Sequence, residues 1–277
     1  MSPLLATPDA GRPGQAPPAA YRRASAVLVA EWIKLRSLRS MLLTPLLGAV
    51  ACGWLADGAS RSNGAGWAHL DAVRKARFDP LGINFNFEVL GVLLFGVLGA
   101  LVATNEYGSG LIRTTLAATP QRGLVLAAKA ALAGPASLAL AVVIVFTAFF
   151  TGQAILSGAH APHVSLGDHH VLAHLLGTVY YLTAAGLIGL FTGVLVRGAA
   201  AAITSIFGLL LVLPVLADRI TPDAVTRHTV PYLPLNLGDE MLHQHPGLSP
   251  GPAVAGLAAW VLVLAAAAAF ALRGRDA

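Results

Sequence analysis

The chain has 277 residues, of which 56% are apolar and 11% charged, and its mean hydropathy is +0.71. These values exclude an ordinary soluble domain and indicate an integral membrane protein. The net charge of +5 and the pI near 9.8 do not indicate nucleic-acid binding, because no basic run lies beside interleaved aromatic residues. The single cysteine, Cys52, lies in an apolar run and excludes both an intramolecular disulfide and a cysteine-based metal site.

Residues 1–20 are rich in proline, alanine and glycine and contain too little apolar surface to form a core. We expect a disordered tail there, followed by a single domain over residues 21–277. The tail has no basic segment followed directly by an apolar core, so we expect no cleaved signal peptide.

Six later stretches approach or exceed the length of about 20 helical residues that crosses a bilayer core. We therefore predict an all-α membrane protein with six transmembrane helices. The first is short and contains Pro45, but a proline in the first turn of a span removes few hydrogen bonds. The predicted spans are residues 38–56, 87–104, 130–151, 171–196, 198–217 and 252–272.

Basic residues favour an orientation with both termini in the cytoplasm. With that orientation twelve Lys and Arg residues lie in inner segments and six in outer loops, and basic residues near span ends resist translocation. The cluster of Arg74, Lys75 and Arg77 in the first outer loop is the exception. The predicted location is the inner (plasma) membrane, with multiple passes.

A short amphipathic helix is predicted over residues 110–119, between the second and third spans. Its apolar residues fall in an arc of about 140° at 100° per residue. Gly108 and Gly110 would allow the chain to turn sharply out of the second span. Two interpretations remain open: an interfacial helix with Arg113 and Arg122 reaching lipid phosphates, or a docking helix for a soluble partner.

The segment from residue 21 to 40 is also amphipathic, with Leu28, Trp32 and Leu35 on one side. Glu31 can pair with Lys34 one turn later. A tryptophan and arginines close to a coming span are typical of a helix that lies along the inner leaflet. We predict an interfacial elbow helix there.

Four stretches carry a resemblance to a known family. They are EWIKLRSLRS before the first span, NEYGSGLIRTTLAATPQR with Lys129 after the second, PYLPLNLG at 231–238, and the terminal LRGRDA. In this order and spacing the chain resembles the small permeases of the type-2 ABC exporter family, from about residue 24 onwards. The outer segment of that family often reads LPSN, whereas this chain has Leu235 in LPLN, and its first outer loop is long.

The resemblance implies a permease subunit of an exporter, paired with an identical or related permease and driven by a separate ATPase. The helix between spans two and three would be the coupling helix that docks into the ATPase. The matching coupling residues are Glu106, Tyr107, Gly108, Gly110, Arg113, Thr114, Pro120 and Arg122. The matching elbow residues are Glu31, Trp32, Lys34 and Arg36.

Nucleotide hydrolysis through a P-loop requires a lysine directly after a glycine, and none of the three lysines, at positions 34, 75 and 129, follows one. ATP and magnesium would therefore be bound by the partner ATPase, and we expect no cofactor in this chain. Motifs of intramembrane enzymes are also missing, so we expect no enzyme. Glu88 and Asp57 lie at predicted outer span ends, where solvated boundary charges are the default interpretation.

All nine histidines fall in predicted outer loops or at an outer boundary. Asp168, His170 and His174 are close enough in sequence to form a metal site, although polar loop histidines are the default interpretation. The alternative function is therefore a non-transporting membrane scaffold, or a sensor of metal or pH that uses these histidines.

Two further features concern packing. Gly189 and Gly193 form a G-x-x-x-G pattern in the fourth span, which would serve either intramolecular packing or subunit contact. The family resemblance implies one or two short helices in the proline-rich last outer loop, folding back at its outer mouth. Apolar spans without buried charge suit a hydrophobic or amphipathic substrate.

Overall fold

The computed structural model describes residues 25, 27–33, 39–85, 87–118, 121–220, 229–243 and 250–274. In these parts the chain is helical and contains no strand. The predicted tail over residues 1–20 lies outside them, as do Lys34, Arg36 and Pro120. The all-α prediction is confirmed for the described part.

Five helices in the described part are long and apolar enough to cross a membrane. Three of the six predicted spans correspond to single helices of similar bounds, the third lies within the longer helix α7, and the fifth corresponds to a helix with a π-helical turn. The first predicted span lies within α2 (Arg39–Gly66), which is not among the five. The five are α5 (Glu88–Gly108), α7 (Arg122–Gly158), α8 (Val171–Val196), α9 (Ala199–Phe207) continued through η2 (Gly208–Val212) and α10 (Leu213–Ile220), and α13 (Pro250–Gly274).

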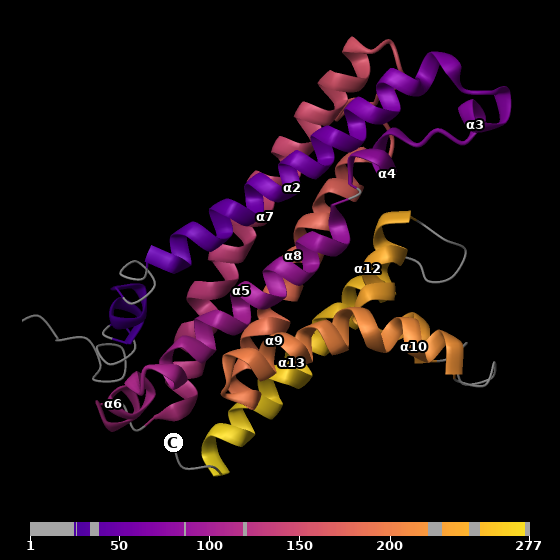
Figure 1. Ribbon diagram of the computed structural model, residues 1–277. Coiled ribbons are helices and arrows are strands. Elements are labelled where there is room, and N and C mark those ends of the chain that lie inside the picture. The colour runs from indigo at the N-terminus through magenta and orange to yellow at the C-terminus, as the bar shows by residue number, and fades with distance from the viewer. Residues whose placement is uncertain are drawn as a thin grey trace, which may run out of the picture.

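The longest helix, α7, has 37 residues and is therefore about 55 Å long, well beyond a bilayer core. It packs along α2, as Figure 1 shows. At one end, which we call the α3 end, α2 is followed by η1 (Trp67–His69) and α3 (Ala72–Ala76), and α4 (Pro80–Asn84) then packs on both α2 and α7. The short helix α6 (Leu111–Ala118) and the C-terminal end of α13 lie at the opposite end, which we call the α6 end.

Glycines bring α5 and α8 into backbone contact at the centre of the molecule. A Cβ atom added at Gly99 would overlap the carbonyl oxygen of Gly186, and one added at Gly189 would overlap that of Gly96. A Cβ at Gly193 would lie 2.8 Å from the carbonyl oxygen of Ala100. The G-x-x-x-G pattern of α8 therefore serves intramolecular packing, one of the two roles left open by the sequence.

The connection from α4 to α5 lies deep in the bundle rather than at its end. The Asn84 Nδ2 atom donates to the carbonyl oxygen of Ala148, 2.8 Å away and ten residues before the end of α7. Gly152 provides room for the Asn84 side chain. The start of α5 is therefore about 15 Å below the end of α7, given the rise of 1.5 Å per residue.

In its described residues, 229–243, the last predicted outer loop contains the two short helices η3 (Val230–Tyr232) and α12 (Pro234–His243), in agreement with the expectation of short helices there. The indole of Trp260 donates to the carbonyl oxygen of Tyr232 at 2.8 Å and so attaches this segment to α13. Leu237 is fully buried between α12 and α13. The α12 helix consequently forms part of the bundle, beside α8 and α13.

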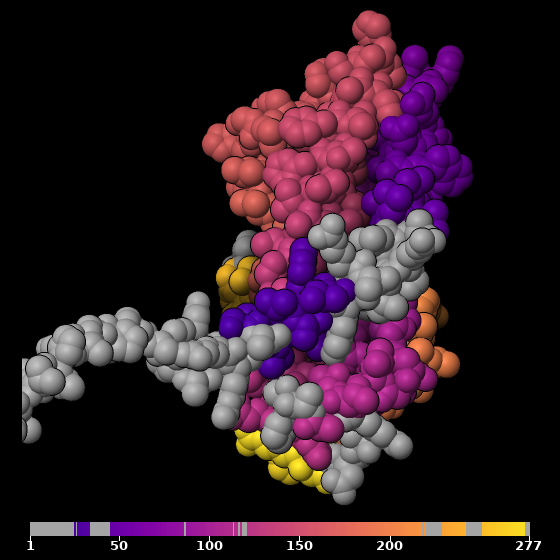
Figure 2. Space-filling view, turned by 90° about the vertical axis from the view of Figure 1, so that its left-hand side faces the viewer, coloured from indigo at the N-terminus to yellow at the C-terminus, as the bar shows by residue number. Residues whose placement is uncertain are grey.

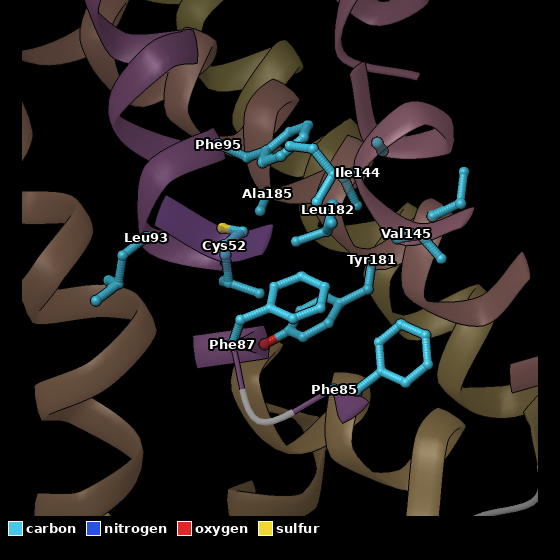
Figure 3. Close-up of a cluster of buried hydrophobic side chains, with 14 of the residues drawn as sticks. Cys52, Phe85, Phe87, Leu93, Phe95, Ile144, Val145, Tyr181, Leu182 and Ala185 are labelled. Carbon is cyan, nitrogen blue, oxygen red and sulfur yellow. The ribbon is translucent and has the colours of Figure 1, made fainter. Parts of the chain in front are cut away.

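The main hydrophobic core lies between α5, α7 and α8, with further residues from α2, α9, α12 and α13. Figure 3 shows its central part, with Phe85 and Phe87 from the α4–α5 connection beside Tyr181 and Leu182 of α8. A second core cluster lies between α7, α8 and α13, nearer the α6 end, and includes Leu190 and Leu272.

Candidate functional site: a buried ion pair network beside α6

A lysine side chain is buried at the α6 end between two carboxylates. Lys129 of α7 is 5% exposed, and its Nζ atom lies 2.7 Å from Oε2 of Glu31 and 2.5 Å from Oε1 of Glu106. Glu31 and Glu106 are 3% and 6% exposed. The three residues come from the N-terminal helical segment, from α7 and from α5, so the network joins three separate parts of the chain.

Helical periodicity explains why these side chains meet. Glu106 follows Ala103 by three residues on the buried side of α5, and Lys129 follows Val125 by four on the buried side of α7. Val27 packs on Val125, and Glu31 lies one turn after Val27 on the same face. Figure 2 shows the N-terminal segment, in indigo, lying against the magenta surface near the α6 end.

Two carboxylates around one ammonium group carry a formal charge of −1 in a protein interior. Removing such ions from water is costly, and their attraction compensates for this cost only while the partners stay in place. The network is therefore poor as a source of net stability but strongly favours one arrangement of the three segments, because any displacement exposes a buried charge without its counterion.

The helix α6 is attached to α5 by a very short turn. The Ser109 hydroxyl donates to the carbonyl oxygen of Asn105 at 2.7 Å, and Gly110 has a φ of +72°, a left-handed conformation that favours glycine. Gly108 is the last residue of α5 and has no positive φ, so of the two predicted hinge glycines only Gly110 needs glycine's conformational freedom. The α6 helix follows directly.

The two sides of α6 differ in exposure. Ile112 is buried, and it lines a small cavity together with Tyr107 and Lys129. Leu111, Thr114 and Ala117 are exposed. One side of α6 therefore rests on the bundle next to the ion pair network, while the other is accessible to a binding partner.

Two arginines attach further helix ends to the same region. The Arg122 Nη1 atom donates to the carbonyl oxygen of Leu272 at 2.7 Å, joining the start of α7 to the end of α13. The Arg197 guanidinium, at the end of α8, lies 5.7 Å from the ring centroid of Tyr107 in a cation–π contact. Four long helices are thus linked around the base of α6.

The predicted coupling residues separate into buried and exposed groups. Glu106, predicted among the coupling residues, has its carboxylate buried against Lys129. Tyr107 and Arg122 also contact the bundle, whereas Thr114 is exposed. The side chain of Arg113 lies outside the described residues.

The predicted elbow is partly described. Trp32 is exposed, as expected for a residue that faces lipid, and Leu28 is at the boundary of exposure. Glu31 contacts Lys129. Its expected pairing with Lys34 concerns a residue outside the described part of the chain, and Arg36 lies outside it as well. The segment therefore packs on α7 through Val27 and Glu31 while its opposite side is open.

The residues considered for a metal site have different roles. The Asp168 Oδ2 atom accepts a hydrogen bond from the backbone N–H of Ser165 at 2.7 Å. His170 is exposed and has a φ of +69°, whereas His174 is buried and its ring centroid lies 4.9 Å from that of Phe85. Within the described ranges no group of three His, Cys, Asp or Glu residues is placed to hold a metal ion.

Lys129 is the residue of the network that sequence reasoning missed as a site residue. The sequence does contain a feature that could have identified it. Lys129 is the single charged residue in the long apolar sequence that follows Arg122 in α7. A lone lysine in a helix of this kind is retained at a cost and indicates a buried partner.

Comparison with known proteins does not assign this chain to a family: no family model matches it, and no curated protein does. The arrangement of α5, α6 and α7 is therefore the basis for a functional assignment. It contains no nucleophile with an adjacent base among the residues just described. What it offers is a mechanical connection between an exposed helix and several long helices.

Proposed function

We propose that this chain is the membrane permease subunit of a type-2 ABC exporter, driven by a separate ATPase that docks on α6. The observation that carries the proposal is the Glu31–Lys129–Glu106 network, which joins the helices on both sides of α6 and the N-terminal segment into one unit. In this proposal α2 is a sixth span, and both termini lie in the cytoplasm with α6.

The proposed mechanism is a lever. The exposed side of α6, with Leu111, Thr114 and Ala117, would contact the ATPase. Because α6 is joined to α5 through one left-handed glycine, a displacement of α6 on ATP binding is transmitted to α5. The contact between Lys129 and Glu106 makes α7 move together with α5.

The ion pair network gives this lever its stiffness. Separating Lys129 from either carboxylate would leave a buried charge unpaired, which costs several kcal/mol. If α5 and α7 were connected flexibly, a motion of α6 would be taken up by local rearrangement. The ion pair network instead favours tilting of α5 and α7 together as rigid helices. The apolar spans and the packed α5–α8 interface suit a hydrophobic or amphipathic substrate that moves between permease subunits.

A partner ATPase is expected when the tagged chain is purified from its native membranes in mild detergent. The partner should be stoichiometric, have a mass of roughly 25–35 kDa, corresponding to one or two domains, and contain a Walker A motif identifiable by mass spectrometry. Purification without such a partner, together with tight zinc binding, would support the alternative function as a metal sensor.

The Ala117→Trp variant is expected to weaken copurification of the ATPase by about tenfold or more, equivalent to about 1.4 kcal/mol, because the indole would enlarge an exposed position of the docking helix. The matched control is Val73→Trp, at an exposed position of α3 at the opposite end. Normal ATPase recovery with the Ala117 variant, or equal loss with both variants, would contradict docking on α6.

A further inference from the structure

A small cavity lies between α6 and the ends of the long helices. Its volume is about 10 Å³, which is room for about one water molecule. Residues from α5, α6, α7, α8 and α13 line it. The cavity is therefore a point at which the short helix meets the ends of four long ones.

Ile112 is the part of α6 that reaches this cavity. Of the α6 side chains that the structure describes, it is the only one that is buried, at 7% exposure, and the only one that lines the cavity. Isoleucine has one strongly preferred χ1 rotamer in a helix, so its side chain moves with the helix backbone. A displacement of α6 consequently moves the Ile112 side chain relative to the rest of the cavity wall.

The rest of the wall belongs to all four long helices. Val194 in the last turn of α8 and Leu272 in the last turn of α13 both line the cavity. They are buried in one core cluster with Ala103 of α5 and Leu126 of α7, which line the cavity as well. The Arg122 Nη1 atom donates to the carbonyl oxygen of Leu272 and holds this part of α13 against α7. The wall is thus a packed unit.

The covalent connection of α6 to α5 does not by itself determine how α6 tilts. Gly110, with its φ of +72°, forms the turn between the two helices, and glycine tolerates a wide range of backbone dihedral angles. The α6 helix can therefore rotate about this turn unless a second contact opposes the rotation. Ile112, two residues later and buried, is placed to make that contact.

We infer that Ile112 is the positioning residue through which α6 presses on the bundle when α6 is displaced. The inference rests on the proposed docking of an ATPase on the exposed side of α6. The turn at Gly110 is then the pivot of the lever, and Ile112 is the point at which α6 acts on the other helices. The ion pair network joins α5 to α7, whereas Ile112 acts on a wall to which α8 and α13 also contribute.

The size of the cavity determines how directly this contact responds. Space for about one water molecule does not admit a further side chain. Packed protein interiors have low compressibility and transmit strain, so a movement of α6 towards the bundle reaches the wall after a small displacement. Truncation of Ile112 would enlarge the cavity and allow α6 to move without moving the wall.

The contact between Ile112 and the wall is tested by thermal unfolding of the full chain in detergent, without the ATPase. Ile112→Ala and Leu272→Ala are each expected to lower the midpoint, and the double variant should lower it by less than the sum, because both side chains line one cavity. The matched control is Leu156→Ala, a fully buried leucine of α7 next to Gly64 of α2, whose effect should add to that of Ile112→Ala. Additive effects of the Ile112 and Leu272 variants would overturn the inference.

Transmission is tested in the purified complex with the ATPase. A solvent-sensitive fluorophore is attached to the Val254→Cys variant, at an exposed position near the start of α13, and its spectrum is compared with and without ATP and vanadate. The natural Cys52 is buried and does not compete for the label. Ile112→Ala is expected to reduce the nucleotide-dependent change by about fivefold or more. Ile112→Val keeps the branched Cβ and should retain most of the change.

The outcomes separate transmission from docking and from a purely structural role. Both Ile112 variants should recover the ATPase as well as the wild type does, because the exposed side of α6 is unchanged, and folding is checked by size-exclusion chromatography. An unchanged response in folded Ile112→Ala would overturn the inference and leave docking on α6 intact. Loss of the response in both variants, loss of ATPase recovery in Ile112→Ala, or no response in the wild-type complex would also overturn it.

Failure of the proposed function has a different signature. If no ATPase is recovered with the wild-type chain, docking on α6 and transmission from it both fail. The unfolding measurement does not involve the ATPase, so it still decides whether Ile112 and Leu272 share one packed cavity.

Discussion

Replacing Lys129 by methionine is expected to lower the free energy of unfolding by about 3–5 kcal/mol, because it leaves Glu31 and Glu106 buried without their counterion. The effect is measured as a decrease of roughly 6–20 °C in the midpoint of thermal unfolding in detergent. The same variant is expected to uncouple ATP hydrolysis from transport in the assembled exporter, since α5 and α7 lose their connection beside α6.

Two comparisons separate burial of charge from loss of a side chain. The triple variant Glu31→Gln, Glu106→Gln, Lys129→Met removes all three charges and should recover most of the lost stability, because neutral groups carry a smaller desolvation cost. The control Arg61→Met breaks the exposed ion pair with Asp57, which joins Nη2 and Oδ2 at 3.1 Å and contributes about 0–1 kcal/mol. If Arg61→Met and Lys129→Met lowered the midpoint equally, the network would not have the role assigned here.

The Gly189→Ala variant is expected to destabilise the protein by about 1–3 kcal/mol, because its Cβ atom would overlap the carbonyl oxygen of Gly96. The overlap is with backbone, so a change of rotamer cannot relieve it, and α5 and α8 would have to separate. Gly99→Ala should have a similar effect through Gly186. The measurement is again thermal unfolding in detergent.

The double variant of Gly99 and Gly189 makes this prediction more specific. Once α5 and α8 have separated to accept one methyl group, the second should cost less, so the two effects should be less than additive. Gly134→Ala is the control, because its Cβ would lie 3.8 Å from Leu187 Cδ2, an ordinary contact. Alanine is favoured over glycine by roughly 0.5–1 kcal/mol in a helix interior, so this control should be neutral or stabilising. Destabilisation of the control to the same extent would argue against backbone contact as the cause.

The sequence by itself determined the helical class, because long apolar runs have to satisfy their backbone hydrogen bonds internally when they are placed in lipid. The bounds of α8 match the prediction, since Val171 follows a histidine-rich loop and Arg197 ends the apolar run. The short helix α6 was also predicted, because glycine and proline limit it on its two sides.

Only the tertiary structure decided which charges are buried. Glu31, Glu106 and Lys129 are separated by 75 and 23 positions along the chain. From its local sequence, each would be interpreted as an ordinary charge near the end of a span. They meet because α5 and α7 pack at one particular rotation and the N-terminal segment folds back onto α7. The position of the α4–α5 connection has a similar cause, since Asn84 at the end of α4 donates to the carbonyl oxygen of Ala148 in α7. Hydrophobic periodicity specifies which face of a helix is buried, but the partner that a buried charge finds depends on the rotation and depth of its neighbours.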